Sequence, residues 1–136
     1  MHNAILYTDT RAELITHALT LDAMQESVGG WICPAFTIPS PRGGSFAITG
    51  YVDDEGLLKE LPLTALRVHP EGRDPLVGPL LVVGLDQSTG ETVPLTDAEI
   101  RWFAMRMKVA VLQNNHEARQ VWWFDFANFT VEGQPT

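Results

Sequence analysis

Cysteine is nearly absent from this sequence: Cys33 is the single thiol in 136 residues, so no disulfide can form within the chain. This excludes the small secreted scaffolds that are held together by disulfides. Long hydrophobic runs are also absent, since none approaches the ~18 residues that cross a membrane. Residues 1–7 carry no basic region of the kind that opens a signal peptide. We therefore expect a cytoplasmic protein without a membrane segment.

Basic residues are scarce as well. Nine Lys and Arg stand against 17 Asp and Glu, which gives a formal net charge of −8. Nonspecific binding to DNA depends on Lys and Arg that neutralise phosphates, and here they do not cluster strongly. The sequence therefore predicts no binding to duplex nucleic acid. The acidic surface could contact a basic protein or imitate DNA, but the simplest interpretation is that it keeps a small domain soluble.

The chain also lacks any recognised catalytic, metal-binding or nucleotide-binding motif. The four histidines have no partner at the spacing of metal ligands, and Cys33 has no second thiol. The adjacent acids Asp53, Asp54 and Glu55 lead into a turn at Gly56, whereas calcium loops spread their ligands along a longer segment. We therefore expect no metal and no cofactor.

What is present suits one folded domain. The length lies in the usual range for a single domain, and 45% of the residues are hydrophobic, enough to form a core. Strand-like and helix-like segments are mixed without regular alternation. We predict a single domain over residues 1–136 in the α+β class. It would have a small mixed or antiparallel sheet, one short helix, one long helix and a C-terminal aromatic strand.

Residues 63–68 are a short apolar segment, and four other segments are typical of strands: residues 4–8, 31–38, 45–52 and 80–85. The last, LLVVGL, is nearly continuously apolar, which predicts burial on both faces. Pro34 predicts that its strand is bulged or at an edge. Residues 14–19 alternate like a strand, while a capping box from Thr10 to Glu13 favours a helix; we favour a strand paired with residues 4–8. Residues 69–75 are predicted to form a loop.

Two helices are expected. The short one covers residues 21–28, with Thr20 as its N-cap and glycines 29 and 30 at its end. The long one begins at the capping box of Thr96 and Glu99 and runs to about residue 113. Its helical wheel has two apolar stripes; the first includes Val111, and the second consists of Trp102, Met105, Val109 and Leu112. A surface helix needs only one such stripe, so a second layer should cover the other.

The C-terminal segment, residues 118–130, is rich in aromatic side chains and reads as a strand. Both of its faces are largely apolar, so one should pack on the domain and the other against the long helix or a second protomer. Core packing, a protein interface and a base-stacking platform all remain open, although the last lacks basic neighbours. The candidate interface, in a homodimer or with another protein, consists of Trp102, Met105, Val109, Trp122, Trp123, Phe124 and Phe126.

Four segments also resemble a known family: residues 21–31 (LDAMQESVGGW), 52–62 (VDDEGLLKELP), 75–84 (PLVGPLLVVG) and 95–100 (LTDAEI). In order and spacing they are similar to the bacterial and phage domain-of-unknown-function family 3846, over roughly residues 14–105. Residues from about 114 to 136 look like an extension. The resemblance implies a small cytoplasmic protein often carried by phages and plasmids. It supplies no activity and no catalytic residues.

The leading functional hypothesis is a non-enzymatic accessory protein of mobile-element type that acts by protein contact, for example on a host defence or regulatory protein. The first alternative is a binder of small, nucleotide-like molecules that would use Arg42, Arg67 or Arg73 beside aromatic walls. The second alternative is an unrecognised enzyme. It would need a pocket that gathers His17, Cys33 or the carboxylates of residues 53–55.

Overall fold

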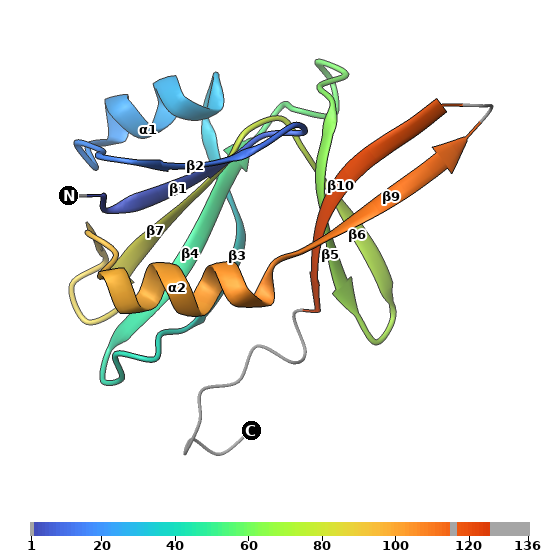
Figure 1. The fold of residues 1–136 in the computed structure, drawn as a ribbon. Helices are drawn as coiled ribbons and strands as arrows, with labels where there is room; N and C mark the ends of the chain where they lie inside the picture. The colour runs from blue at the N-terminus through green and yellow to red at the C-terminus, as the bar shows by residue number, and fades with distance from the viewer. Residues whose placement is uncertain (1, 115–116, 126–136) are drawn as a thin grey trace.

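A computed structural model describes residues 2–114 and 117–125. In these ranges the chain forms two sheets and two helices (Figure 1). Sheet A has the strand order β2-β1-β7-β4-β3, with β8 also paired to β7, and sheet B has the order β6-β5-β10-β9. The strands of sheet A are β1 (Ala4–Tyr7), β2 (Ala12–Ile15), β3 (Ile32–Pro39), β4 (Phe46–Asp53), β7 (Leu80–Asp86) and β8 (Glu91–Val93). Those of sheet B are β5 (Leu63–His69), β6 (Gly72–Val77), β9 (Lys108–Asn114) and β10 (Glu117–Asp125). The helices are α1 (Leu21–Val28) and α2 (Asp97–Arg106).

The central strand β7 shows why sheet A lies inside the molecule. Its side chains alternate between the two faces, as strand geometry requires. Leu80 and Val82 join the larger core cluster, while Leu81 and Val83 join the smaller one, and all four are fully buried. The predicted burial of this strand on both faces is therefore confirmed.

Different elements cover the two faces of sheet A. Helix α1 packs Met24 and Val28 onto one face, and its N-cap Thr20 accepts a hydrogen bond from the backbone N–H of Ala23, as predicted. Helix α2 and sheet B cover the other face, where Phe103 and Phe124 are fully buried. The chain thus has three layers, and the core between sheet A and sheet B is the larger one.

The strands of sheet A decide two points that the sequence raised, although the strand favoured over residues 14–19 already ends at Ile15. Residues 12–15 form β2 and pair antiparallel with β1, so the helix suggested by the capping box at Thr10 does not form. Pro34 lies in β3, at the edge of sheet A, where the register with β4 shifts between Pro34 and Phe36. Both predicted positions for this proline, an edge strand and a bulge, are confirmed.

The predicted loop at residues 69–75 is wrong. Strand β5 continues to His69 and β6 begins at Gly72, so only a short turn separates them. The breaker-rich sequence is compatible with a strand because β6 is the outer strand of sheet B, where Pro75 removes no essential ladder hydrogen bond. The cross-strand pair of Arg67 and Asp74 also joins the two strands.

The predicted long helix is wrong too, although the coarser α+β class with two helices holds. Helix α2 ends at Arg106, Met107 is extended, and the next seven residues form β9. The second apolar stripe therefore does not exist, because its four members belong to two elements. On a strand, Val109 and Leu112 lie on opposite faces, since successive side chains alternate. The pairing of β9 with β10 satisfies the backbone groups that a longer helix would have used.

Strand β10 lies in the middle of sheet B, parallel to β5 and antiparallel to β9. It was expected over residues 118–130; residues 126–130, with Phe126, lie outside the described residues. In the ranges that are described, neither helix has the length and apolar character needed to cross a membrane.

Candidate binding surface

Strand β9 forms an open edge of sheet B. It pairs with β10 from Lys108 to Asn114, and among the described residues no strand pairs with its other side. Strand β5 supports β10 only over residues 122–125. The outer part of the β9–β10 pair is therefore a two-stranded ribbon that extends away from the body of the molecule (Figure 1). Such a ribbon is at best marginally stable without further packing.

Apolar side chains are exposed along this edge. Val111 is 68% exposed, and Val109 and Leu112 are also exposed. Met105, near the end of α2 just before β9, is 77% exposed. An exposed apolar edge strand is a template for pairing with another chain. We call Val109, Val111 and Leu112, together with the unpaired backbone of β9, the β9 edge.

Of the interface residues predicted from the sequence, some lie in the core of the described structure and others lie nearer the surface. Phe124 is fully buried, and its ring lies 5.0 Å from that of Phe36 in an edge-on contact. The Trp122 indole N–H donates to the carbonyl of Thr8 at 3.1 Å, and its ring packs 5.1 Å from Tyr7. These two aromatics attach sheet B to sheet A. Both are parts of the core in this chain.

The other predicted interface residues lie nearer the surface. Trp102 is half-buried, with the guanidinium of Arg106 4.2 Å from its ring centroid, and Trp123 is half-buried in β10. Met105 and Val109 are exposed. Sequence reasoning did not select Val111 for the interface, because helical spacing placed it in the stripe assigned to the core. The alternation of a strand would have put it beside Val109 on one face.

Two of the three candidate ligand-binding arginines form ion pairs within the chain. Arg42 approaches the buried Glu99 at 3.3 Å, and its guanidinium lies 3.8 Å from the ring centroid of Phe46. Arg67 pairs with Asp74 at 2.6 Å and donates to the carbonyl of Ala35. The third, Arg73, is exposed on β6. The structure thus gives the first two arginines internal carboxylates as partners.

Two residues considered for catalysis, Cys33 and His17, interact with neighbouring groups of the chain. Burial and the negative charge of Asp54 raise the pKa of the Cys33 thiol, whereas a nucleophilic cysteine needs a lowered one. The His17 ring accepts a hydrogen bond from the backbone N–H of Leu19 at 2.8 Å, and its other nitrogen lies 2.9 Å from the Ser27 hydroxyl. Both ring nitrogens of His17 are thus engaged, one within the connection between β2 and α1 and the other with Ser27 of α1.

In the third candidate group, residues 53–55, Asp53 is engaged locally, whereas Asp54 and Glu55 are exposed. Asp53 accepts a hydrogen bond from the Lys59 ammonium at 2.6 Å, and that bond lowers the pKa of this buried carboxyl group. Its other oxygen accepts from the backbone N–H of Glu55. Among the described residues, no group of three or more His, Cys, Asp or Glu is arranged to hold a metal ion.

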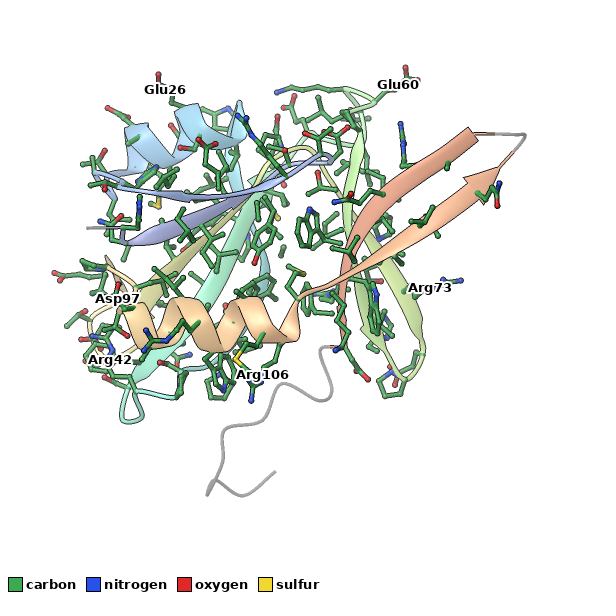
Figure 2. The ribbon with its side chains drawn as sticks, viewed as in Figure 1. Glu26, Arg42, Glu60, Arg73, Asp97 and Arg106 are labelled. Carbon is green, nitrogen blue, oxygen red and sulfur yellow. The ribbon has the colours of Figure 1, made fainter. Side chains whose placement is uncertain are left out.

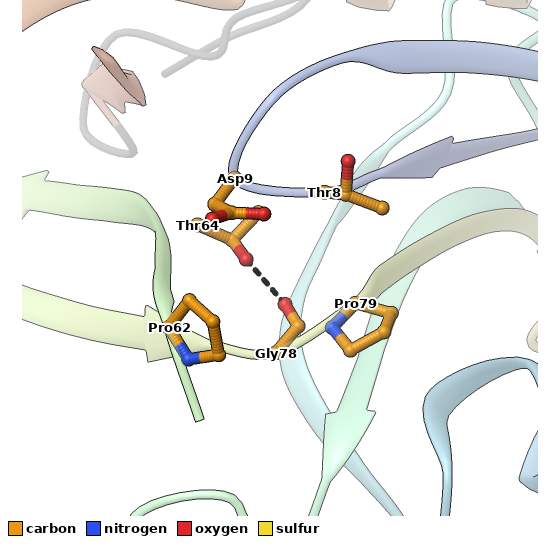
Figure 3. A pocket seen from close by; sticks show the side chains of 6 residues that line it. All are labelled: Thr8, Asp9, Pro62, Thr64, Gly78 and Pro79. Atoms are coloured by element: carbon orange, nitrogen blue, oxygen red, sulfur yellow. Dashed lines mark hydrogen bonds between the residues drawn. The ribbon is translucent and has the colours of Figure 1, made fainter. Parts of the chain in front are cut away.

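One pocket of about 230 Å³ opens where the β1–β2 turn meets the start of β5 and the connection from β6 to β7 (Figure 3). Its lining residues are Thr8, Asp9, Pro62, Thr64, Gly78 and Pro79. The walls are mostly apolar, and none of the three candidate arginines lies there. The only ionisable side chain in the lining is the acidic Asp9, which suits a cation better than a phosphate.

Comparison with known proteins gives one match. A family model described as "Domain of unknown function (DUF3846)" matches residues 1–108. This confirms the resemblance read from the sequence segments, over a longer range than the residues 14–105 expected. The match covers sheet A, both helices and the β5–β6 hairpin, and ends at the start of β9. No match was found among curated proteins or among solved structures.

Proposed function

The chain belongs to the DUF3846 family, and we propose that it acts by binding another protein through the β9 edge rather than by catalysis. One observation carries the proposal: on the projecting ribbon, exposed apolar side chains coincide with a strand edge that no described strand pairs with. Water solvates the outward N–H and C=O groups of β9. A strand added there would form hydrogen bonds with these groups and bury Val109 and Val111 at the same time.

The energetics favour an occupant that is itself an extended strand. Its backbone would form ladder hydrogen bonds with β9, and its side chains would cover Val109 and Val111. Burial of apolar surface contributes about 25 cal/mol per Å². Lys108 is the only charged residue of β9, so little charge must be desolvated.

Two partners fit this description. The first is a second copy of the chain, because an antiparallel pairing centred on Val111 would set Lys108 opposite Asn114 and bring no like charges together. The resulting two-fold dimer is a common closed arrangement. The second is a host protein. The association with phages and plasmids that the family resemblance implies directs the search toward defence and regulatory proteins.

The test replaces Val109 and Val111 with lysine, since charges on an edge strand oppose strand addition. The matched control is Leu14→Lys on β2, an exposed apolar residue on the outer strand of sheet A. Sedimentation of the pure chain reports self-association, and affinity capture from host lysate with increasing bait reports a foreign partner. We expect a dimer or one saturable partner that persists in the control and disappears in the double variant. Association that is unchanged in the double variant would refute the proposal.

The pocket beside Asp9 supports binding of a small molecule as a second candidate function. A nucleotide is disfavoured there, because no arginine faces the pocket and Asp9 repels phosphates. Native mass spectrometry of the purified protein would reveal a retained ligand, and a thermal-shift panel of nucleotides and amines would identify its class. No retained mass and no shift would remove this alternative.

A further inference from the structure

A second exposed apolar cluster lies far from β9 along the chain. Trp31 is 69% exposed and Leu58 84% exposed, and Leu57 beside it is also exposed. Trp31 follows helix α1, whereas the leucines belong to the turn after β4. The two segments are joined, because the backbone N–H of Asp54 donates to the carbonyl of Trp31 at 2.8 Å. The two segments that carry the three exposed side chains therefore lie side by side.

The turn after β4 places Gly56 on its inner side. Gly56 is buried against Val77, and a Cβ atom there would lie 2.9 Å from a methyl group of that valine. The carbonyl of Gly56 accepts a hydrogen bond from the N–H of Leu61 at 3.1 Å, which closes the turn. Gly56 thus lies on the inner side of the turn, while the two leucines that follow it are exposed to solvent.

Exposed carboxylates lie in the same turn as the two leucines. Asp54, Glu55 and Glu60 are exposed in the turn itself. Figure 2 shows Glu60 at the outer side of the molecule, pointing away from the ribbon. The single cation of the turn, Lys59, is bound to Asp53 at 2.6 Å and to the carbonyl of Gly29 at 3.2 Å. The turn therefore combines exposed apolar side chains with exposed carboxylates, and its cation already has a partner.

We propose that this surface binds a basic amphipathic segment of a partner protein. The apolar side of such a segment would pack on Trp31, Leu57 and Leu58, while its Lys and Arg residues would face the exposed carboxylates of the turn. Tryptophan at the centre of a contact is typical of the residues that dominate binding energy. Complementary charge would accelerate encounter and select the partner. We call Trp31, Asp54, Glu55, Leu57, Leu58 and Glu60 the Trp31 surface.

The charge also argues against two other occupants. A second copy of the chain would bring the same carboxylates against themselves, and the like charges would repel. A membrane surface rich in anionic lipids would be repelled for the same reason. The Trp31 surface shares no residue with the β9 edge, so this proposal holds or fails independently of strand addition.

The test uses a fluorescent synthetic amphipathic helix of Leu and Lys, and a companion peptide in which Glu replaces every Lys. Fluorescence anisotropy with the full chain measures both affinities. We expect saturable binding of the Lys peptide that weakens as salt is raised, because salt screens exposed charges. The Glu peptide should not bind. Equal binding of the two peptides would overturn the proposal.

Variants then locate the contact. Trp31→Ser with Leu58→Ser should weaken binding of the Lys peptide about tenfold or more, and Glu55→Lys with Glu60→Lys should weaken it as well. Met105→Ser is the matched control, because this exposed residue lies on α2, across sheet A from α1. Circular dichroism confirms that each variant is folded. If the Trp31 and Leu58 variant binds like wild type, or the control loses as much affinity, the assignment of this surface is wrong.

Discussion

The carboxylate of Glu99 accepts a hydrogen bond from the Ser40 hydroxyl at 2.6 Å, across 59 positions of sequence. Glu99 is only 1% exposed, although it lies in the first turn of α2. Its other oxygen accepts from the backbone N–H of Thr96 at 2.9 Å and approaches Arg42 at 3.3 Å. One side chain therefore caps the helix and fixes it to the connection between β3 and β4.

Glu99→Ala should lower the free energy of unfolding by about 3 kcal/mol, because removing one partner leaves buried polar groups unsatisfied. Glu99→Gln should lower the free energy of unfolding by a smaller amount, since glutamine can still complete the capping box. Urea denaturation measures both changes, with Asp97→Asn in the exposed part of the same turn as the control. An alanine variant within about 0.5 kcal/mol of wild type would contradict this role, because that is the range of ordinary surface substitutions.

The β5–β6 hairpin should become less stable in alkaline solution. Hydrogen bonds that His69 donates to the carboxylate of Asp74, and then to that of Glu71, raise the pKa of His69. The stabilisation by protonated His69 is complete below its unfolded-state pKa of about 6.5 and is lost as pH rises through the higher folded-state value. Asp74 stays ionised throughout, because its bonds to Arg67 and then His69 lower its pKa.

The measurement is the difference in unfolding free energy between wild type and His69→Gln. It is made at pH values from below the unfolded-state pKa of His69 to above its raised folded-state pKa. The difference should be largest near about pH 6 and shrink above it, since the protonated imidazole is the form that is bound. His2→Gln removes an exposed histidine as the control and should leave the wild-type pH profile intact. A difference that is independent of pH would show that the charge of His69 has no part in stability.

Glu60→Gly should stabilise the protein. Glu60 has a φ of 54°, in the left-handed region that non-glycine residues adopt at a disadvantage of about 1 kcal/mol. Glycine removes that strain, so the thermal midpoint should rise. Glu55→Gly in the same turn is the matched control. Its backbone has no positive φ, so there glycine should destabilise by adding unfolded-state entropy.

Cys33 should alkylate slowly near neutral pH. Burial, followed by the charge of Asp54, raises the pKa of its thiol, and only the thiolate reacts. Asp54→Asn should shift the pH dependence of iodoacetamide labelling toward lower pH. Rapid labelling of the wild type at pH 7 would instead indicate an activated cysteine, and with it the enzymatic alternative.

Local signals in the sequence predicted the elements that depend on local structure. Thr20 and Gly29 mark both ends of α1, and Thr96 with Glu99 marks the start of α2, because caps act within one turn. The end of α2 could not be predicted in the same way. The segment after it contains neither glycine nor proline, and its apolar residues fit a helix or a strand. The pairing of β9 with β10 decided between them, and that pairing is a tertiary contact.

The candidate surfaces were harder to predict than the fold, because residue type does not determine exposure. The sequence left open whether the aromatic segment is core or interface, and the structure buries Phe124 fully. Trp31 and Leu58 were not selected, because they lie in two segments that the sequence gives no reason to join. The hydrogen bond from the Asp54 N–H to the Trp31 carbonyl sets these segments side by side. That bond is a tertiary contact, which no local motif marks.

The position of β10 has a consequence for synthesis on the ribosome. Ala65 of β5 pairs with Trp122, so β5 emerges long before the strand that will lie next to it. Until then, the nascent chain exposes an open hairpin whose buried residues, Ala65 and Leu76, lack Phe124 as a neighbour. Exposed edges of this kind attract other unfinished chains. The interval before β10 is translated is therefore when a nascent-chain chaperone would have most effect on the yield of folded protein.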